Sequence, residues 1–283
     1  MGTINKTSRW GQLGRHTLLL LASIIMIYPL LWMIGSAFKP ESQIFTNPGA
    51  LPTEFKLDNF IDGWSALRID FTVFYINSFI IAGLSVVGNL LACSMTAYAF
   101  ARLDFKLKRL WFTLMLCTLM LPYQVTLVPQ YILFHQLGWV NTYLPLIVPK
   151  FLAVDAFFVF LMVQFFRGIP REIDEAAILD GCGPWRIYWR IMLPLSTPAL
   201  ATAAIFSFIW TYDDFLGPLI YLNDMRQWTV PLALRAFVDA SGGESLYGEL
   251  FAMSTLSLLP VFAVFLIFQR MIIRGIALGA LKG

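Results

Sequence analysis

Residues 175–194 read EAAILDGCGPWRIYWRIMLP, one of the few long hydrophilic segments of a 283-residue chain. Just before it, Pro170 can open a helix, because proline is tolerated at a first helical position. The first turn then carries negative charge, which the helix dipole favours, on Glu172, Asp174 and Glu175. Gly181 is a natural helix stop, Pro184 can begin a second short helix, and Pro194 closes the unit. The stretch therefore predicts two short helices joined by a turn.

The composition around this stretch is that of an integral membrane protein. The chain is 58% hydrophobic and 13% charged, with a mean hydropathy of +0.71, whereas a soluble domain carries about 25% charged residues. The net charge of +3 is weak and dispersed, so we expect membrane lipid around the chain and no nucleic-acid partner.

Chemistry-bearing patterns are missing from the sequence. There is no G-x-x-x-x-G-K-[ST] phosphate loop, no H-E-x-x-H zinc motif and no G-x-S-x-G elbow. Cys93, Cys117 and Cys182 show no paired spacing, so we expect free thiols that pack as small apolar residues. His16 and His135 are isolated and suit membrane interfaces. We therefore expect no catalytic residue, no bound cofactor and no metal site in this chain.

Uncharged runs predict an all-α membrane protein with six transmembrane helices, since about 20 apolar residues cross a bilayer. The first run, 17–38, is too long for the 7–15-residue core of a signal peptide, so we interpret it as a retained span after a polar amino terminus, 1–16. An exposed loop with a short helix is expected over 39–70, and a polar loop over 223–249. The other predicted spans are 71–101, 110–134, 145–166, 198–222 and 250–269.

Two features within the spans suggest local structure. The second span carries small residues at three- and four-residue steps, a pattern that lets membrane helices approach closely: Ser85, Gly88, Ala92, Thr96 and Ala99. We interpret this stripe as a packing face. Pro122 and Pro129 fall inside the third span, where proline usually kinks a membrane helix.

Four charged residues fall in or near the fourth and fifth spans, where such residues usually face a bundle interior or an aqueous cavity. Lys150 is near the start of its span, where its side chain can reach the interface. Asp155 is deeper, and either lines a path or pairs across helices. Asp213 and Asp214 either line the translocation path or cap a helix broken near Pro218.

The positive charges predict which face of the membrane holds residues 175–194. Fourteen of the 20 Lys and Arg residues lie in the amino terminus, in 102–109, in 167–190 or at the carboxyl end. Positive residues favour the cytoplasm. We therefore expect both termini and the 175–194 stretch on the cytoplasmic side of a multi-pass protein of a bacterial or archaeal cell (inner) membrane. An amphipathic connector resting on the membrane surface is the simpler alternative for the stretch.

The stretch resembles the EAA loop of ABC-importer permeases at its defining positions, which are Glu175, Ala176, Ala177, Gly181, Ile191, Leu193 and Pro194. Two further segments carry the resemblance. Residues 212–216 read YDDFL where the family pattern is W-N-D-F-L, and the chain ends in a G-x-x-K-G-like tail, 279–283. The chain as a whole resembles the carbohydrate group, the maltose/oligosaccharide and glycerol-phosphate type.

This resemblance implies a type I importer permease fold, with a permease domain over 71–274, an EAA loop over 167–194 and a cytoplasmic tail over 275–283. It implies an unlike pair with a second permease subunit, a cytoplasmic ABC ATPase dimer that binds the ATP, and an extracytoplasmic solute-binding protein. The EAA loop would dock in a cleft of the ATPase, with Glu175 in polar contact and Ala176 and Ala177 allowing close approach. The solute would be a sugar, an oligosaccharide or a related polyol. An ion-coupled secondary transporter is the alternative, because charged residues within spans can carry ions.

Overall fold

A computed structural model describes residues 9–240 and 246–280 of the chain. Residues 1–8 of the expected amino terminus and residues 281–283 of the expected tail lie outside the described residues. The chain divides into two compact units. The first, unit 1, comprises Met1–Asp70 and Leu234–Leu258, and the second, unit 2, comprises Phe71–Ala233 and Leu259–Gly283.

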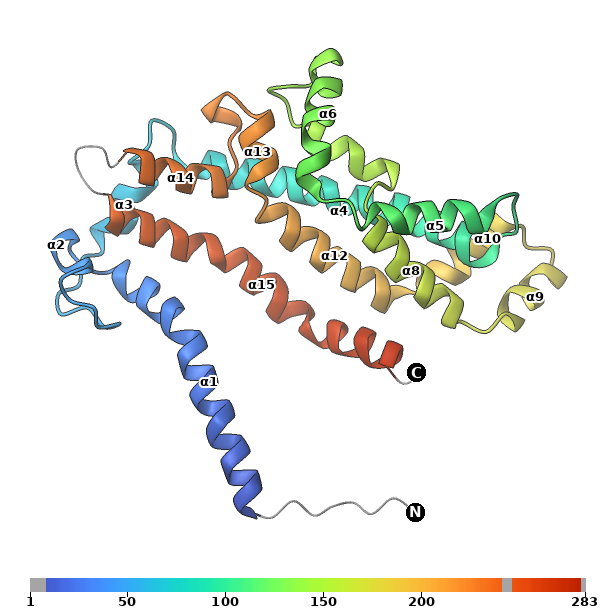
Figure 1. Ribbon diagram of the computed structural model, residues 1–283, viewed down its shortest axis with the longest axis horizontal. Helices are drawn as coiled ribbons and strands as arrows, with labels where there is room; N and C mark the ends of the chain where they lie inside the picture. Colours follow the sequence, from blue (N-terminus) through green and yellow to red (C-terminus); the bar gives the residue numbers. More distant parts are fainter. Residues whose placement is uncertain (1–8, 241–245, 281–283) are drawn as a thin grey trace. The chain divides into compact units, whose positions relative to one another are not determined.

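The described residues are helical and contain no strand (Figure 1). Four stretches are long and apolar enough to cross a membrane: Gln12–Ser36, Phe71–Arg102, Leu144–Gly168 and Tyr247–Gln269. Two further pairs of helices pass the same test together, with a bend between their members, and the number reaches six when each bent pair forms one span. The predicted all-α, six-span membrane fold is confirmed.

Unit 1 begins with α1 (Arg9–Ser36) and continues through α2 (Glu41–Ile44) and α3 (Asp58–Ser65). The loop over 39–70 is more ordered than the exposed loop that we expected. Asn59 is buried, and its Nδ2 donates to the carbonyls of Ala37 and Lys39, both at 2.9 Å. Lys39 is also buried, and its Nζ donates to two carbonyls of the following turn.

The last helix, α15 (Tyr247–Ala280), begins in unit 1. Its amino-terminal N–H groups, which have no partner within the helix, are capped by the Glu41 carboxylate. The N–H groups of Tyr247 and Gly248 lie 3.3 and 3.0 Å from its two oxygens. The rings of Trp32 and Phe251 meet edge to face, with centroids 5.3 Å apart. These contacts hold the end of α1 and the start of α15 to the loop between them.

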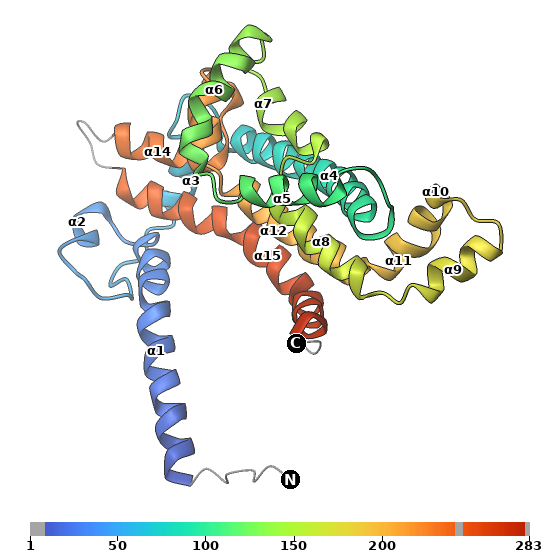
Figure 2. The ribbon, with the colours of Figure 1, turned by 45° about the vertical axis from the view of Figure 1, so that its right-hand side comes forward.

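Unit 2 is built around α4 (Phe71–Arg102), an uninterrupted 32-residue helix packed along α8 and α12 (Figures 1 and 2). Its small-residue stripe is a packing face, as predicted. Ser85, Gly88 and Ala92 are buried. A Cβ added at Gly88 would lie only 2.7 Å from the Phe151 ring. The helix can therefore approach the segment around Phe151 closely because residue 88 has no side chain.

The other spans of unit 2 are broken. The third is α5 (Lys108–Thr118) followed by α6 (Tyr123–Gln136), bent by 101° at a break that ends at Pro122, whereas Pro129 lies inside α6. The fourth consists of α7 (Leu144–Ile147), the 3₁₀ turn η1 (Val148–Leu152) and α8 (Ala156–Gly168). The fifth is α12 (Thr197–Tyr212), and α13 (Leu216–Tyr221) follows it after a gap.

One sequence-based expectation about the loops was wrong. The described part of 223–249 contains the short turn η3 (Met225–Gln227) and an eleven-residue helix, α14 (Val230–Ala240), in place of a polar loop, while residues 241–245 lie outside the described residues. Four buried apolar residues of α14 explain the difference: Val230, Leu232, Ala233 and Phe237. Arg235 and Asp239, which suggest a solvated loop in the sequence, form an i,i+4 pair at 3.4 Å on the exposed face.

Candidate functional site

The two helices predicted in the 167–194 loop are present, and the turn between them has a defined geometry. The first, α9, runs Glu172–Leu179, and the second begins at Pro184 as α10 (Pro184–Ile187). Gly181 has φ +77°, and its N–H donates to Ile178 O, while the N–H of Cys182 donates to Ala177 O. These two bonds form a Schellman motif, in which a left-handed residue ends a helix. Gly181 is thus the helix stop that the sequence predicts.

The second helix changes its winding before it joins the fifth span. After α10, residues Tyr188–Met192 (η2) form a π-helical turn, and Leu193–Leu195 (α11) return to α geometry. Pro194 sits in the first turn of α11 and does not end the unit, because proline is compatible with that position. A bend of 77° separates Pro184–Leu195 from α12.

The tip of the loop exposes large apolar side chains. Leu179 is 88% exposed and Ile178 is 60% exposed at the end of α9, and Trp185 is 64% exposed at the start of the second helix. Glu175 and Ala176 lie on the exposed side of α9. Figure 2 shows α9 and α10 beyond the ends of α4 and α8. In the part of the chain that the structure describes, nothing covers these side chains.

The opposite face of the loop is fixed in the core of unit 2. Ala177, Ile187, Tyr188 and Met192 are buried in one cluster with residues of α4 and α8, and Ile191 and Leu193 pack against its edge. The predicted EAA positions therefore divide into two groups. Glu175, Ala176, Gly181 and Pro194 are exposed. Ala177 faces the chain's own interior, with Ile191 and Leu193 half-buried at the edge of the same cluster.

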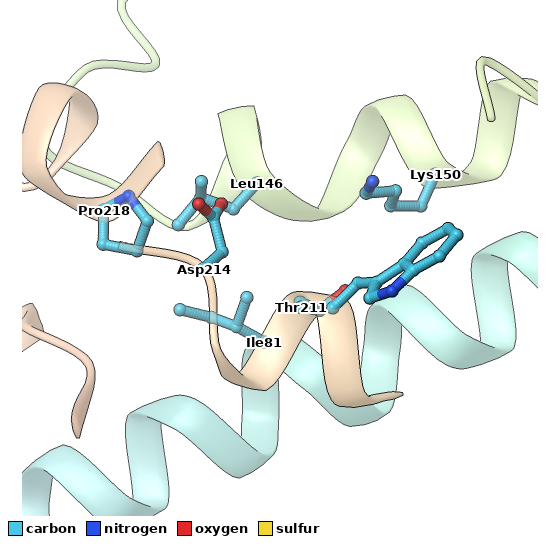
Figure 3. Close-up of a pocket in the computed structure, with 7 residues that line it drawn as sticks. Ile81, Leu146, Lys150, Thr211, Asp214 and Pro218 are labelled. Carbon is cyan, nitrogen blue, oxygen red and sulfur yellow. The ribbon is translucent and has the colours of Figure 1, made fainter. Parts of the chain in front are cut away.

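A small cavity of about 70 Å³ lies where the broken spans meet α4. Its lining comes from α4, α7, η1, α12 and α13 and from the gap before α13, and comprises Ile81, Leu146, Lys150, Trp210, Thr211, Asp214 and Pro218 (Figure 3). The walls combine an ammonium, a carboxylate, a hydroxyl and an indole ring. Sites for small molecules usually measure about 300–1,000 Å³, so this cavity is closed down to the size of a few water molecules.

The charged residues predicted within the spans have different surroundings. Lys150 Nζ donates to Asp155 Oδ2 at 2.9 Å, and each of the two side chains is about a quarter exposed. Asp155 is therefore paired with a positive charge. It does not line the cavity. Asp214 lines the cavity and also accepts the N–H of Gly217 in the first turn of α13, at 3.2 Å. Asp213 is exposed and lines no part of this cavity.

Sequence reasoning missed two features of this region. Lys150, which the sequence places near the start of its span where its side chain can reach the interface, lines the cavity. The pair with Asp155 depends on the 3₁₀ turn η1 and on Ala153, a left-handed residue with φ +55°. Together these bring two residues five positions apart to one side, which a regular helix would not do. Ala153 carries no sequence signal for such a conformation, whereas the prolines at 145 and 149 indicate irregular winding.

Six spans, a helix–turn–helix between the fourth and fifth, and a polar cavity at the breaks in the spans are features of a membrane transport subunit. Comparison with known proteins specifies the class. The family model described as "Binding-protein-dependent transport system inner membrane component" matches residues 88–278. The chain belongs to this family and is a permease subunit of an ABC importer, which confirms the resemblance found in the sequence.

Curated relatives match over nearly the full chain. The probable ABC transporter permease protein YurM of Bacillus subtilis (strain 168) is 36% identical, covering 99% of this chain and 90% of the relative. The arabinooligosaccharides transport system permease protein AraQ of Halalkalibacterium halodurans is 36% identical, with 92% and 93% covered. The trehalose/maltose transport system permease protein MalG of Thermococcus litoralis is 33% identical, with 93% and 94% covered. None of these relatives supports the ion-coupled alternative.

A solved structure confirms the fold. A chain in the crystal structure of a bacterial ABC transporter involved in the import of the acidic polysaccharide alginate superposes with a TM-score of 0.83. The match covers 95% of this chain and 99% of that one, at 20% sequence identity. The likeness at this identity establishes a shared architecture.

Proposed function

We propose that residues 167–194 dock on a separate ATPase dimer and couple its ATP hydrolysis to transport by this chain, which has no catalytic activity and binds no cofactor of its own. The exposed tip carries this proposal. Leu179, Ile178 and Trp185 present apolar side chains outward from a loop whose other face is fixed in the core. Exposed large apolar groups gathered at one place mark interaction sites. Glu175 adds a carboxylate beside them for polar contact with the ATPase.

The proposal also sets the orientation of the chain. The loop must face the ATPase in the cytoplasm, which agrees with the excess of Lys and Arg on that side. Both termini then lie in the cytoplasm, 39–70 faces outward, and 71–274 forms the permease domain before the 275–283 tail. On that outer side we place the extracytoplasmic solute-binding protein. A second, unlike permease subunit completes the path across the membrane.

We further propose that the solute is a sugar, an oligosaccharide or a related polyol. Relatives named for arabinooligosaccharides and for trehalose and maltose support this class. The cavity agrees in its chemistry. Lys150, Thr211 and Asp214 offer donors and acceptors for hydroxyl groups, and Trp210 offers a flat face for the C–H side of a sugar ring. Asp214 is the acidic residue that we keep on the path, while Asp155 acts through Lys150. The cavity has to widen before such a solute can pass.

Docking is tested by placing a charge at the tip. In Leu179→Asp the apolar contact is lost, and we expect the ATPase to be absent when the permease complex is purified. The matched control is Leu107→Asp, because Leu107 is a 63% exposed leucine in the loop before α5 and lies outside the 167–194 loop. Retention of the ATPase by Leu179→Asp refutes the docking proposal.

The solute class is tested with the cognate binding protein. Calorimetric titration with hexoses, di- and trisaccharides and glycerol phosphate should show tight binding of at least one of them. Uptake of that solute by cells should then depend on this chain and on Asp214. A binding protein that takes only amino acids, peptides or metal ions would overturn the assignment.

A further inference from the structure

Two buried polar contacts join residues 167–194, here called the coupling loop, to α4. This helix is not a neighbour of the loop in the sequence. The first is an ion pair at the cytoplasmic end of the helix. Arg102 Nε lies 3.2 Å from Asp174 Oδ2, and the two side chains are 5% and 16% exposed. The same guanidinium donates from Nη2 to the carbonyl of Ile169 at 2.6 Å. Arg102 thus holds both the entry to the loop and its first helix.

The second contact joins α4 to the other helix of the loop. The hydroxyl groups of Tyr188 and Ser94 are 2.7 Å apart, and both residues are fully buried. The ring of Tyr188 also packs on that of Tyr98, with centroids 5.4 Å apart. Ser94, Tyr98 and Arg102 follow one another at four-residue steps and therefore form one ridge along α4. Each helix of the loop is attached to this ridge.

Both contacts are made to α4, which is continuous, whereas the fourth and fifth spans beside the cavity are interrupted. The fourth span is interrupted around Ala153, and the fifth ends its regular helix at Tyr212. By contrast, α4 runs without a break from Arg102 to Ile81 in the cavity wall. These two residues are separated by 21 positions, or about 30 Å at 1.5 Å per residue. A rigid rod transmits a displacement over that distance better than two interrupted helices do.

We infer that Arg102, Asp174, Tyr188 and Ser94 are positioning residues that make the coupling loop and α4 one rigid lever. Through this lever, movement of the ATPase reaches the cavity wall at Ile81 directly, in addition to any movement through α8 and α12. This inference rests on the proposed docking of the loop on the ATPase. Chain connectivity alone would let only the fourth and fifth spans carry movement from the loop. The inference adds α4 to them.

The test uses the full importer complex with both permease subunits, the ATPase and the binding protein. Spin labels at exposed positions 84 on α4 and 216 on α13 report the distance across the cavity region, with the three native cysteines replaced by alanine or serine. The probe is ATP with Mg²⁺ and vanadate, so the solute need not be known. The variants are Asp174→Asn and Tyr188→Phe, which delete a charge and a hydroxyl group with almost no change in shape.

We expect both variants to retain the ATPase but to lose the ATP-induced shift in the label distance. Coupling free energies between sites correspond to about 5- to 150-fold, so the ratio of shifted to unshifted complexes should fall by at least about fivefold. Asp174→Glu, which keeps the charge, should restore most of the shift. Asp104→Asn is the matched control, since Asp104 pairs with Lys108 at 3.4 Å in a neighbouring loop but is 94% exposed. It should behave as the unaltered chain does.

Three results separate the lever from the docking proposal. A normal shift in Asp174→Asn and Tyr188→Phe overturns the lever, even where the tip variant Leu179→Asp loses the ATPase as proposed. Retention of the ATPase by Leu179→Asp overturns the docking proposal and the lever with it. If Asp174→Asn fails to assemble, Tyr188→Phe decides the question, because loss of one hydroxyl group leaves the packing of the ring intact.

Discussion

The close contact at Gly88 gives a quantitative prediction about the packing of α4. In Gly88→Ala, the new Cβ would lie 2.7 Å from Phe151 Cδ2 and 3.0 Å from the backbone carbonyl carbon of Lys150. Carbon atoms normally meet at about 3.5–4.0 Å. The methyl group therefore pushes on a backbone atom of η1, which cannot rotate away as a side chain can.

The size of the effect follows from two opposing contributions. Overpacking of this kind costs about 1–3 kcal/mol, while replacing glycine by alanine inside a helix gains about 1 kcal/mol. The net expectation for Gly88→Ala is a loss of roughly 0–2 kcal/mol in the free energy of unfolding. Gly83, on the same helix, has nothing within 4 Å of an added Cβ. Gly83→Ala should therefore gain the helix propensity of about 1 kcal/mol without any cost of overpacking.

The measurement is a comparison of the two variants. Titration with SDS, followed by circular dichroism in mixed micelles, gives the free energy of unfolding for each protein. We expect Gly88→Ala to be less stable than Gly83→Ala by about 1–3 kcal/mol. Equal stability of the two variants would refute the claim that the missing side chain at residue 88 sets the approach of η1 to α4.

Three further perturbations test other parts of the structure. Gly181→Val forces a β-branched residue to φ +77° and should cost about 1–2 kcal/mol, seen as faster proteolysis of the 167–194 loop. Lys150→Met leaves the partly exposed Asp155 unpaired, so it should be more destabilising than the double variant Lys150→Met/Asp155→Leu, measured by the same SDS titration. Lys39→Ala removes the charged donor to two carbonyls, and hydrogen bonds to charged groups contribute about 1.5–3 kcal/mol, so the variant should expose residues 45–57 to protease.

Each of these expectations has a result that contradicts it. A Gly181→Val loop as resistant to protease as the native one would mean that the backbone there relaxes without strain. If the double variant at Lys150 and Asp155 is less stable than Lys150→Met, water must hydrogen-bond the unpaired Asp155 carboxylate well enough to replace Lys150. Unchanged cleavage in Lys39→Ala would mean that the turn after α2 is held by its other contacts.

Sequence reasoning succeeded where the determinants are local. The uncharged run of 71–101 predicts α4 to within a residue at its carboxyl end, because an apolar segment in a membrane satisfies its backbone hydrogen bonds internally as a helix. Gly181 is predictable as a helix stop, since the left-handed conformation that ends α9 favours glycine wherever it occurs. The capping alternative for Asp214 also rests on neighbouring backbone and is borne out by its bond to Gly217.

Sequence reasoning failed where distant parts of the chain decide the outcome. Whether Ala177 faces outward or inward depends on the residues of α4 and α8 that cover it, which are far away in the sequence. The pairing of Lys150 with Asp155 depends on the left-handed Ala153, and the burial of Asn59 depends on carbonyls 20 and 22 positions away. Hydropathy places such residues in a span or a loop, but it does not give their partners.

The π-helical turn at Tyr188–Met192 has a consequence for how the chain can change in evolution. A turn of this kind holds one residue more than an α-helical turn, so the deletion of one residue there would leave a regular helix of acceptable geometry. Because the π turn already absorbs the extra residue, the residues that follow would keep nearly their present directions. A deletion in an α-helical stretch would instead rotate everything that follows it by about 100°. A one-residue deletion should therefore disturb the entry into α12 least when it falls within this π turn.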